Sequence, residues 1–203
     1  EKLENARKVL VVGDFLAGGL ADGLEESFAK SPGVVVVEQS SGSSGLVRDD
    51  YYDWPAELPG IIEEVKPDIV VVQLGSNDSQ QMRTESGRVE VRSEAWVAEY
   101  ERRTDSVIKA VRDGNRPLVW VGLPSFNFTS MSADMVALMN DTKLLMSSSV
   151  NGTVMQTGAN RDADGTIDRS PPPTAEVCVI LKELKRAINR YGIDMTSEFR
   201  TQG

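Results

Sequence analysis

Two short polar segments, each directly after an apolar run, carry the residue types that could do chemistry. Gly13-Asp14 follows the run 8–12, and Asn77-Asp78 lies just beyond the run 69–74. A carboxylate can act as a general base, and a side-chain amide can donate a hydrogen bond to an oxyanion. The same residues also have structural uses, because an aspartate can cap a helix and an Asn-Asp pair can form a turn. Asp14, Asn77 and Asp78 are therefore candidates for a polar site.

The chain lacks the proton acceptor on which a serine hydrolase ordinarily depends. It contains no histidine, and a Ser–His mechanism needs an imidazole to take the hydroxyl proton near neutral pH. The Ser/Gly-rich segment 39–45 offers Ser43 and Ser44 as replacement nucleophiles, with Asp14 or Asp78 as the base. We expect this segment to be a solvated loop, and an enzyme of this unusual kind is the alternative.

A Ser–Lys dyad is another substitute that the residue types of this chain would permit. Lys66 is expected at the edge of the sheet opposite the 39–45 loop, and Lys143 is expected on a helix. We therefore expect neither lysine to activate a serine of that loop.

The segment 160–168 resembles the first nine positions of an EF-hand calcium loop. Asp162, Asp164 and Asp168 are its acidic oxygen donors, and the position that normally holds a bidentate glutamate is Pro171. An acidic surface turn would have the same composition. We expect no cofactor, with calcium at these three aspartates as the alternative.

Strand-like runs that alternate with amphipathic segments predict βαβ units around a parallel sheet. The loops that follow the strands would share the carboxyl edge of that sheet, where ligands bind in open α/β folds. The stretch 79–91 looks polar and irregular. The predicted strands are 8–12, 34–38, 68–74, 118–122 and 153–156, and the predicted helices are 16–29, 56–65, 94–112, 133–146 and 174–191.

Length and charge restrict the class of protein. The 203 residues suit a single domain, 1–203, and the formal net charge of −9 argues against nucleic acid or an anionic membrane surface as a partner. No apolar run approaches the ~20 residues of a membrane-spanning helix, and no signal peptide is visible. The single cysteine, Cys178, lies in an apolar stretch and is expected to be buried and unreactive.

Four stretches together form a more specific pattern, which spans roughly the first two-thirds of the chain. They are Val11-Val12-Gly13-Asp14 with 18–24, 44–48 with Tyr51-Tyr52-Asp53-Trp54-Pro55, Gly75-Ser76-Asn77-Asp78, and 120–124 with 131–135. This pattern resembles the SGNH (GDSL-type) hydrolase superfamily, and more closely its bacterial branch of unknown function. The resemblance implies one α/β domain, a three-layer α/β/α sandwich around a flavodoxin-like parallel sheet of about five strands.

The resemblance also implies roles for individual positions. Phe15 stands where the family has its nucleophilic serine, and Asn77 matches the asparagine that donates to the oxyanion. Gly45, or alternatively Gly42, matches the glycine whose backbone N–H is the second donor. The late Asp-x-x-His motif is absent, and Asp164-Gly165-Thr166-Ile167 falls in the corresponding region with isoleucine in place of the imidazole.

These observations predict a catalytically inactive SGNH-like protein. We expect it to bind a small acylated or glycan-like ligand, or a protein partner, at the carboxyl edge of the sheet. The alternative is an esterase or acyltransferase with a non-standard catalytic apparatus. The resemblance implies a periplasmic or other extracytoplasmic location. The expected ligand-binding residues are Asp14, Phe15, Gly45, Asn77 and Asp78, and no residue is expected to be catalytic.

Overall fold

The computed structural model describes residues 1–123, 134–139 and 153–155, and its sheet runs through the middle of the molecule. The strands are β1 (Arg7–Gly13), β2 (Val34–Ser40), β3 (Ile69–Gln73), β6 (Leu118–Val121) and β7 (Thr153–Met155), in the order β2-β1-β3-β6-β7. Every neighbouring pair is parallel. The flavodoxin-like sheet of five strands expected from the sequence is therefore confirmed.

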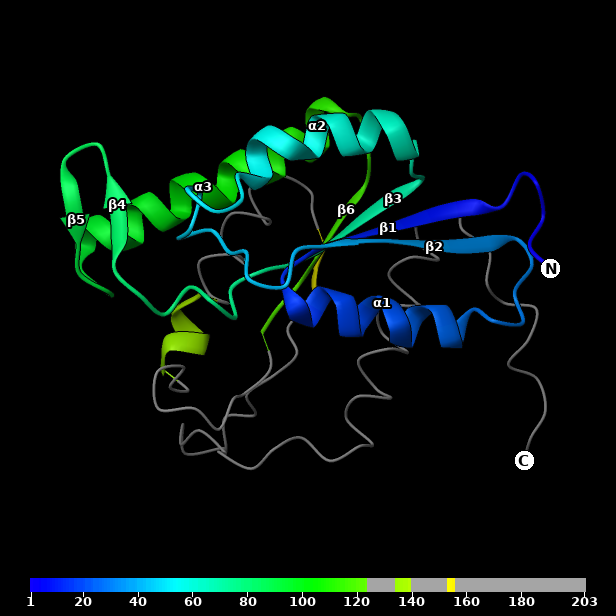
Figure 1. The fold of residues 1–203 in the computed structure, drawn as a ribbon, viewed down its shortest axis with the longest axis horizontal. Helices are drawn as coiled ribbons and strands as arrows, with labels where there is room; N and C mark the ends of the chain where they lie inside the picture. Colours follow the sequence, from blue (N-terminus) through cyan, green and yellow to red (C-terminus); the bar gives the residue numbers. More distant parts are fainter. Residues whose placement is uncertain (124–133, 140–152, 156–203) are drawn as a thin grey trace.

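Helices cover both faces of this sheet, with α1 (Phe15–Ser27) on one side and α2 (Trp54–Val65) and α3 (Glu94–Asp113) on the other (Figure 1). The strands are almost purely apolar because both of their faces are covered. In β1, Val9 and Val11 pack toward α1, while Leu10 and Val12 pack toward α2 and α3. This alternation produces the three layers.

The sheet changes direction between β1 and β3. The chain passes from β1 outward to β2 and then returns to β3 on the other side of β1. In sheets of this order, a crevice forms at the switch point outside the carboxyl ends of the two strands. The segments 13–15 and 75–78, which the sequence marked as candidates, directly follow these two strands.

A side-chain oxygen caps the start of each of the three helices. Asp14 accepts from the N–H of Leu16, Asp53 from that of Ala56, and Ser93 from that of Trp96. Such caps satisfy N–H groups that have no partner inside the helix. Polar residues in the loops thus fix where these helices begin. Asp14, directly after β1, is one of them.

The prediction that residues 79–91 are irregular is wrong. They contain an antiparallel hairpin of β4 (Met82–Thr84) and β5 (Gly87–Val89), which lies beside α3 (Figure 1). The strands have only three residues each, so their polar, Arg-rich sequence shows no strand-like periodicity. Burial of Met82 holds the hairpin against the core.

Several predictions fall outside the described residues. These are the calcium segment 160–168 with Asp162, Asp164 and Asp168, the final helix, Cys178 and Lys143. Of the predicted helix 133–146, residues 134–139 are described and helical. Among the residues that the structure describes, no helix combines the length and hydropathy needed to cross a bilayer.

Candidate functional site

Asp14 ties together the ends of the two strands at the switch point. Its Oδ1 accepts the N–H of Leu16 at 3.0 Å, and its Oδ2 accepts the N–H groups of Gly75 and Ser76 at 2.9 Å each. Burial raises the pKa of Asp14, and the hydroxyl and N–H of Ser76, with the other two N–H groups, offset part of that rise. The carboxylate is therefore already surrounded by donors from the protein itself.

Only glycine fits immediately before this aspartate. Gly13 has a φ of +145°, which side-chain-bearing residues rarely adopt, and an added Cβ would overlap the carbonyl oxygen of Gln73. The close approach of β1 and β3 at this point is what brings Asp14 within reach of the backbone after β3.

Phe15, at the first position of α1, is not buried at the switch point. Its side chain is 50% exposed. A methyl group added to Gly42 would lie 3.8 Å from the Cβ of Phe15, so the 39–45 loop passes beside it. The ring therefore forms an exposed apolar surface at the carboxyl edge of the sheet.

The amide of Asn77 holds the 39–45 loop. Its Nδ2 donates to the carbonyl oxygens of Gly42 at 3.1 Å and Ser44 at 2.7 Å. An amide nitrogen has two hydrogens, so both are used within the protein in this arrangement. The resemblance assigned an oxyanion-binding role to Asn77, and that role would require at least one of these bonds to open.

Asp78 is buried beneath the segment Leu46-Val47, which follows the 39–45 loop, and it lies against Gly45. Its two carboxylate oxygens accept the N–H groups of Leu46 at 3.1 Å and Val47 at 3.0 Å, and Oδ2 also accepts the hydroxyl of Tyr100 at 3.1 Å. Burial and this carboxylate raise the pKa of Tyr100 well above its ordinary value, which keeps the phenol a donor. A Cβ on Gly45 would collide with Asp78.

The two glycines proposed as backbone donors therefore differ in their surroundings. Gly45 is buried against Asp78, whereas Gly42 is exposed beside Phe15. A ligand approaching Phe15 would meet the backbone around Gly42 first. Of the two, Gly42 is the better placed for a ligand.

The serines of the same loop differ just as clearly. Ser44 is buried, and its hydroxyl accepts from the indole Nε1 of Trp54 at 2.9 Å and faces the carbonyl of Gly13 at 3.5 Å. Ser43 is exposed. Ser44 thus serves to pack the loop onto α2, and Ser43 is the hydroxyl of this pair that solvent can reach.

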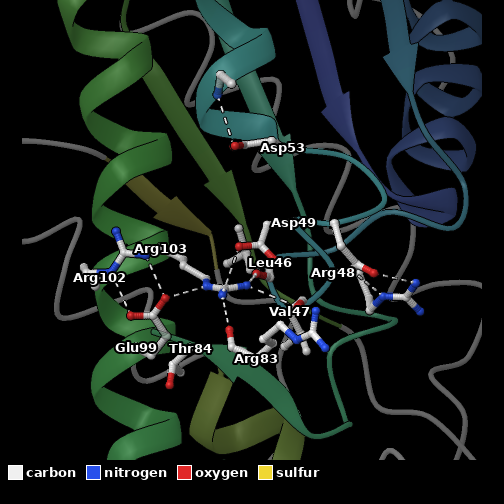
Figure 2. A network of polar contacts seen from close by, with 12 residues as sticks. Leu46, Val47, Arg48, Asp49, Asp53, Arg83, Thr84, Glu99, Arg102 and Arg103 are labelled. Carbon is white, nitrogen blue, oxygen red and sulfur yellow. Dashed lines mark hydrogen bonds and ion pairs between the residues drawn. The ribbon is translucent and has the colours of Figure 1, made fainter. Parts of the chain in front are cut away.

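Arg103, the centre of a polar network on α3 (Figure 2), is not among the residues predicted from the sequence. Its guanidinium is buried and donates to the carbonyl oxygens of Leu46 at 2.7 Å and Val47 at 3.2 Å, and to that of Arg83 at 2.7 Å. It also forms ion pairs with two carboxylates, those of Asp49 at 3.0 Å and Glu99 at 2.8 Å. An arginine on the buried stripe of an amphipathic helix was the available signal.

The two candidate bases at this edge of the sheet are closed to solvent, whereas the hydroxyl of Ser40, at the end of β2, donates to the carboxylate of Glu38. Asp14 and Asp78 are fully buried, and their oxygens accept bonds from protein donors. In this part of the chain, no group of three acidic, cysteine or histidine side chains could hold a metal ion. What this edge of the sheet does present is a half-exposed aromatic ring beside the exposed residues Gly42 and Ser43.

A sheet of this order, with a Gly-Asp turn and a Gly-x-Asn-Asp turn at its switch point, defines a hydrolase-like fold of the SGNH (GDSL) class. Residues 8–170 match the family described as "Protein of unknown function (DUF459)", and the chain belongs to this family, which is part of that superfamily. No curated protein sequence matches the chain significantly.

Solved structures with a similar fold include esterases and a GDSL-like lipase. A GDSL-like lipase from Bacteroides thetaiotaomicron is similar with a TM-score of 0.63 and 12% identity, over 93% of this chain and 90% of the lipase. A catalytic mutant of an acetylxylan esterase from Geobacillus stearothermophilus is similar with a TM-score of 0.59 and 17% identity, over 93% of this chain and 96% of the esterase. A psychrotrophic esterase from Pseudoalteromonas sp., inhibited by monoethylphosphonate, is similar with a TM-score of 0.58 and 15% identity, over 93% of this chain and 100% of the esterase. At such identities the likeness shows the fold.

Proposed function

We propose that this protein is a catalytically inactive SGNH-like module that binds a small acylated or glycan-like ligand at the carboxyl edge of its sheet. The observation that carries the proposal is Phe15. A half-exposed aromatic ring occupies the position of the family nucleophile, at the start of α1 and beside the exposed loop at Gly42. An aromatic face in such a crevice can stack on a sugar ring or lie against an acyl chain.

The surrounding polar groups support binding over catalysis. The chain has no histidine, and the two candidate bases already accept protein N–H groups, at 2.9 Å for Asp14 and 3.0 Å for Asp78. Each hydrogen bond that a carboxylate accepts stabilises its ionised form and so weakens its tendency to take a proton from a serine. Removal of triad members leaves about 10³–10⁴-fold catalysis over water in enzymes where this was measured.

The neighbours in fold support the choice of ligand. One is an acetylxylan esterase and another is a GDSL-like lipase, so their names describe an acylated glycan and an acyl ester as targets. A module that kept the crevice and lost the nucleophile would bind such a molecule without cleaving it. Acetylated xylo-oligosaccharides are therefore the first probes to use.

Hydrolysis of p-nitrophenyl acetate tests the absence of catalysis. We expect no turnover above a buffer blank, and no gain when Phe15→Ser is made alone, because no imidazole accompanies the new hydroxyl. Steady hydrolysis that Ser43→Ala abolishes would replace this proposal with the alternative, an esterase or acyltransferase of unusual mechanism.

Calorimetric titration with acetylated xylo-oligosaccharides tests the binding. We expect saturable binding that weakens about tenfold or more in Phe15→Ala, since burial of an aromatic face supplies most of the contact. Leu3→Ala is the matched control, because Leu3 is 54% exposed, close to the 50% of Phe15, and lies before β1 at the opposite edge of the sheet. Equal affinity of both variants, or no binding by the parent chain to any acylated probe, would refute the ligand-binding role.

The resemblance supports a location outside the cytoplasmic membrane, and we propose a periplasmic or other extracytoplasmic site of action. Acylated glycans occur in cell envelopes, so the ligand class and the location are consistent. Fractionation of cells that carry the protein, followed by immunodetection, would contradict this location if the protein stayed with the cytoplasmic markers.

A further inference from the structure

A cleft whose lining does not include Phe15 lies between the 47–50 loop and the β4–β5 hairpin. Its volume is about 500 Å³. Val47, Arg48 and Asp50 form one wall, and residues 80–83 with Arg88 form the other. Three guanidinium groups and one carboxylate line this cleft, in a chain whose net charge is −9.

Two of these arginines face each other across the hairpin. Arg83 on β4 is the direct cross-strand partner of Arg88 on β5, and both are exposed. Like charges in directly opposed positions destabilise a strand pair. Neither arginine forms an ion pair with any residue that the structure describes. An unfavourable pair of this kind is explained if an anion occupies the space between the two side chains.

The third arginine is already partly neutralised. Arg48 forms an ion pair with Asp50 at 2.7 Å. The hydrogen bond from Arg48 is the main cause that lowers the pKa of Asp50, and the charge of Arg83 lowers it further. With one carboxylate against three guanidinium groups, the lining carries a net charge of +2. A dianion would balance it.

The cleft is held in shape by Arg103. Its buried guanidinium donates to the carbonyl oxygens of Leu46 and Val47 on one wall and of Arg83 on the other (Figure 2). A hairpin with strands of three residues would otherwise be marginal. One side chain thus ties the backbone at Leu46 and Val47 to the backbone of the hairpin at Arg83.

We infer that this cleft binds a phosphate monoester, with Arg83 and Arg88 as its principal ligands and Arg48 as a third. A phosphate monoester is close to a dianion at neutral pH and accepts several charge-assisted hydrogen bonds from guanidinium groups. A soluble phosphorylated molecule fits better than a lipid headgroup, because the net charge of −9 opposes approach to an anionic membrane.

Calorimetric titration of the full chain with inorganic phosphate and with glucose 6-phosphate tests this inference, with sodium chloride at matched ionic strength as the blank. We expect saturable binding of both and at least about a tenfold loss of affinity in the Arg83→Gln/Arg88→Gln double variant. Lys109→Gln/Arg112→Gln removes the same two charges from exposed positions near the end of α3 and should bind like the parent chain. Vesicles of phosphatidylcholine with phosphatidic acid form a separate arm, and binding to these alone would assign the phosphate to a lipid.

Thermal unfolding separates a ligand site from a structural role. Because the opposed arginines repel each other, Arg88→Gln should keep or slightly raise the Tm while it weakens phosphate binding. A lowered Tm with unchanged affinity, or no binding above chloride in any arm, would overturn the inference. The result is independent of the function proposed for the crevice, since Phe15→Ala should leave phosphate affinity unchanged.

Discussion

The segment Leu46-Val47 is held from two sides by opposite charges. Asp78, at the carboxyl edge of the sheet, accepts the N–H groups of both residues. Arg103, from the middle of α3, donates to the carbonyl oxygens of the same two residues. The two charged side chains use the same short backbone segment, yet they belong to regions whose charged groups differ in exposure.

At the sheet edge the charged groups are closed to outside molecules. Asp14 and Asp78 have their oxygens occupied by protein donors, so they position loops. In the hairpin region only the central Arg103 is used in this way, while Arg83 and Arg88 point from an exposed strand pair into a cleft. The buried charges hold backbone segments in place, whereas the exposed like charges are those for which we propose a ligand.

The largest effect is expected from Asp78→Ala. The change leaves the N–H groups of Leu46 and Val47 and the hydroxyl of Tyr100 without their acceptor inside the core. Loss of a buried charged partner of this kind costs about 3–5 kcal/mol. Urea unfolding monitored by circular dichroism should show the loss in the free energy of unfolding. Asp22→Ala, at an exposed position of α1, is the control and should stay within about 0.5 kcal/mol of the parent.

Arg103→Met should cost somewhat less, about 2–4 kcal/mol, because methionine retains the packing of the side-chain stem. Three backbone carbonyls lose their donor, among them that of Arg83 in the hairpin. Hydrogen exchange should therefore accelerate in β4 and β5 before it changes in β1. Arg102→Met on the same helix removes a mostly exposed charge and should leave the hairpin protected. If both variants exchange alike, Arg103 does not anchor the hairpin.

Much of the fold follows from the sequence because parallel strands covered on two faces are continuous apolar runs. This pattern predicts strands over 8–12 and 68–74, and the structure has β1 and β3 there. The hairpin at 82–89 was missed because each strand has three residues, too few to show alternation. Its stability comes from Met82 and from Arg103, which lies more than a dozen residues away in the chain.

The sequence located the candidate site better than it assigned its parts. The order of the strands requires that the turns at Asp14 and Asn77 meet, and they do. Which donors and acceptors these side chains use depends on the path of the 39–45 loop, and no local pattern specifies that path. The exposed Gly42 and the buried Gly45 look equivalent in the sequence, and tertiary packing alone distinguishes them.

A smaller, pH-dependent effect is expected from Glu99, which orients Arg103. Hydrogen bonds from Arg102, then those from Arg103, lower the pKa of Glu99 from 4.5 to about 2. A carboxyl with a lowered pKa stabilises the fold above the unfolded pKa and loses that contribution as the pH falls through about 4.5 toward about 2. Glu99→Gln should therefore cost about 1 kcal/mol at neutral pH and progressively less in acid. An equal cost at every pH would show that the ionised form is irrelevant.

The smallest effect on stability is expected from Phe15→Ala, and a second phenylalanine beside α1 provides its control. Phe15 is 50% exposed, whereas Phe28, at the other end of the helix, is 0% exposed. Truncation of Phe28 should cost about 3–5 kcal/mol. Truncation of Phe15 removes less buried surface and places a better helix former in α1, so the free energy of unfolding should change by no more than about 0.5 kcal/mol. If the two truncations instead destabilise equally, Phe15 is a core residue and cannot be the surface on which a ligand rests.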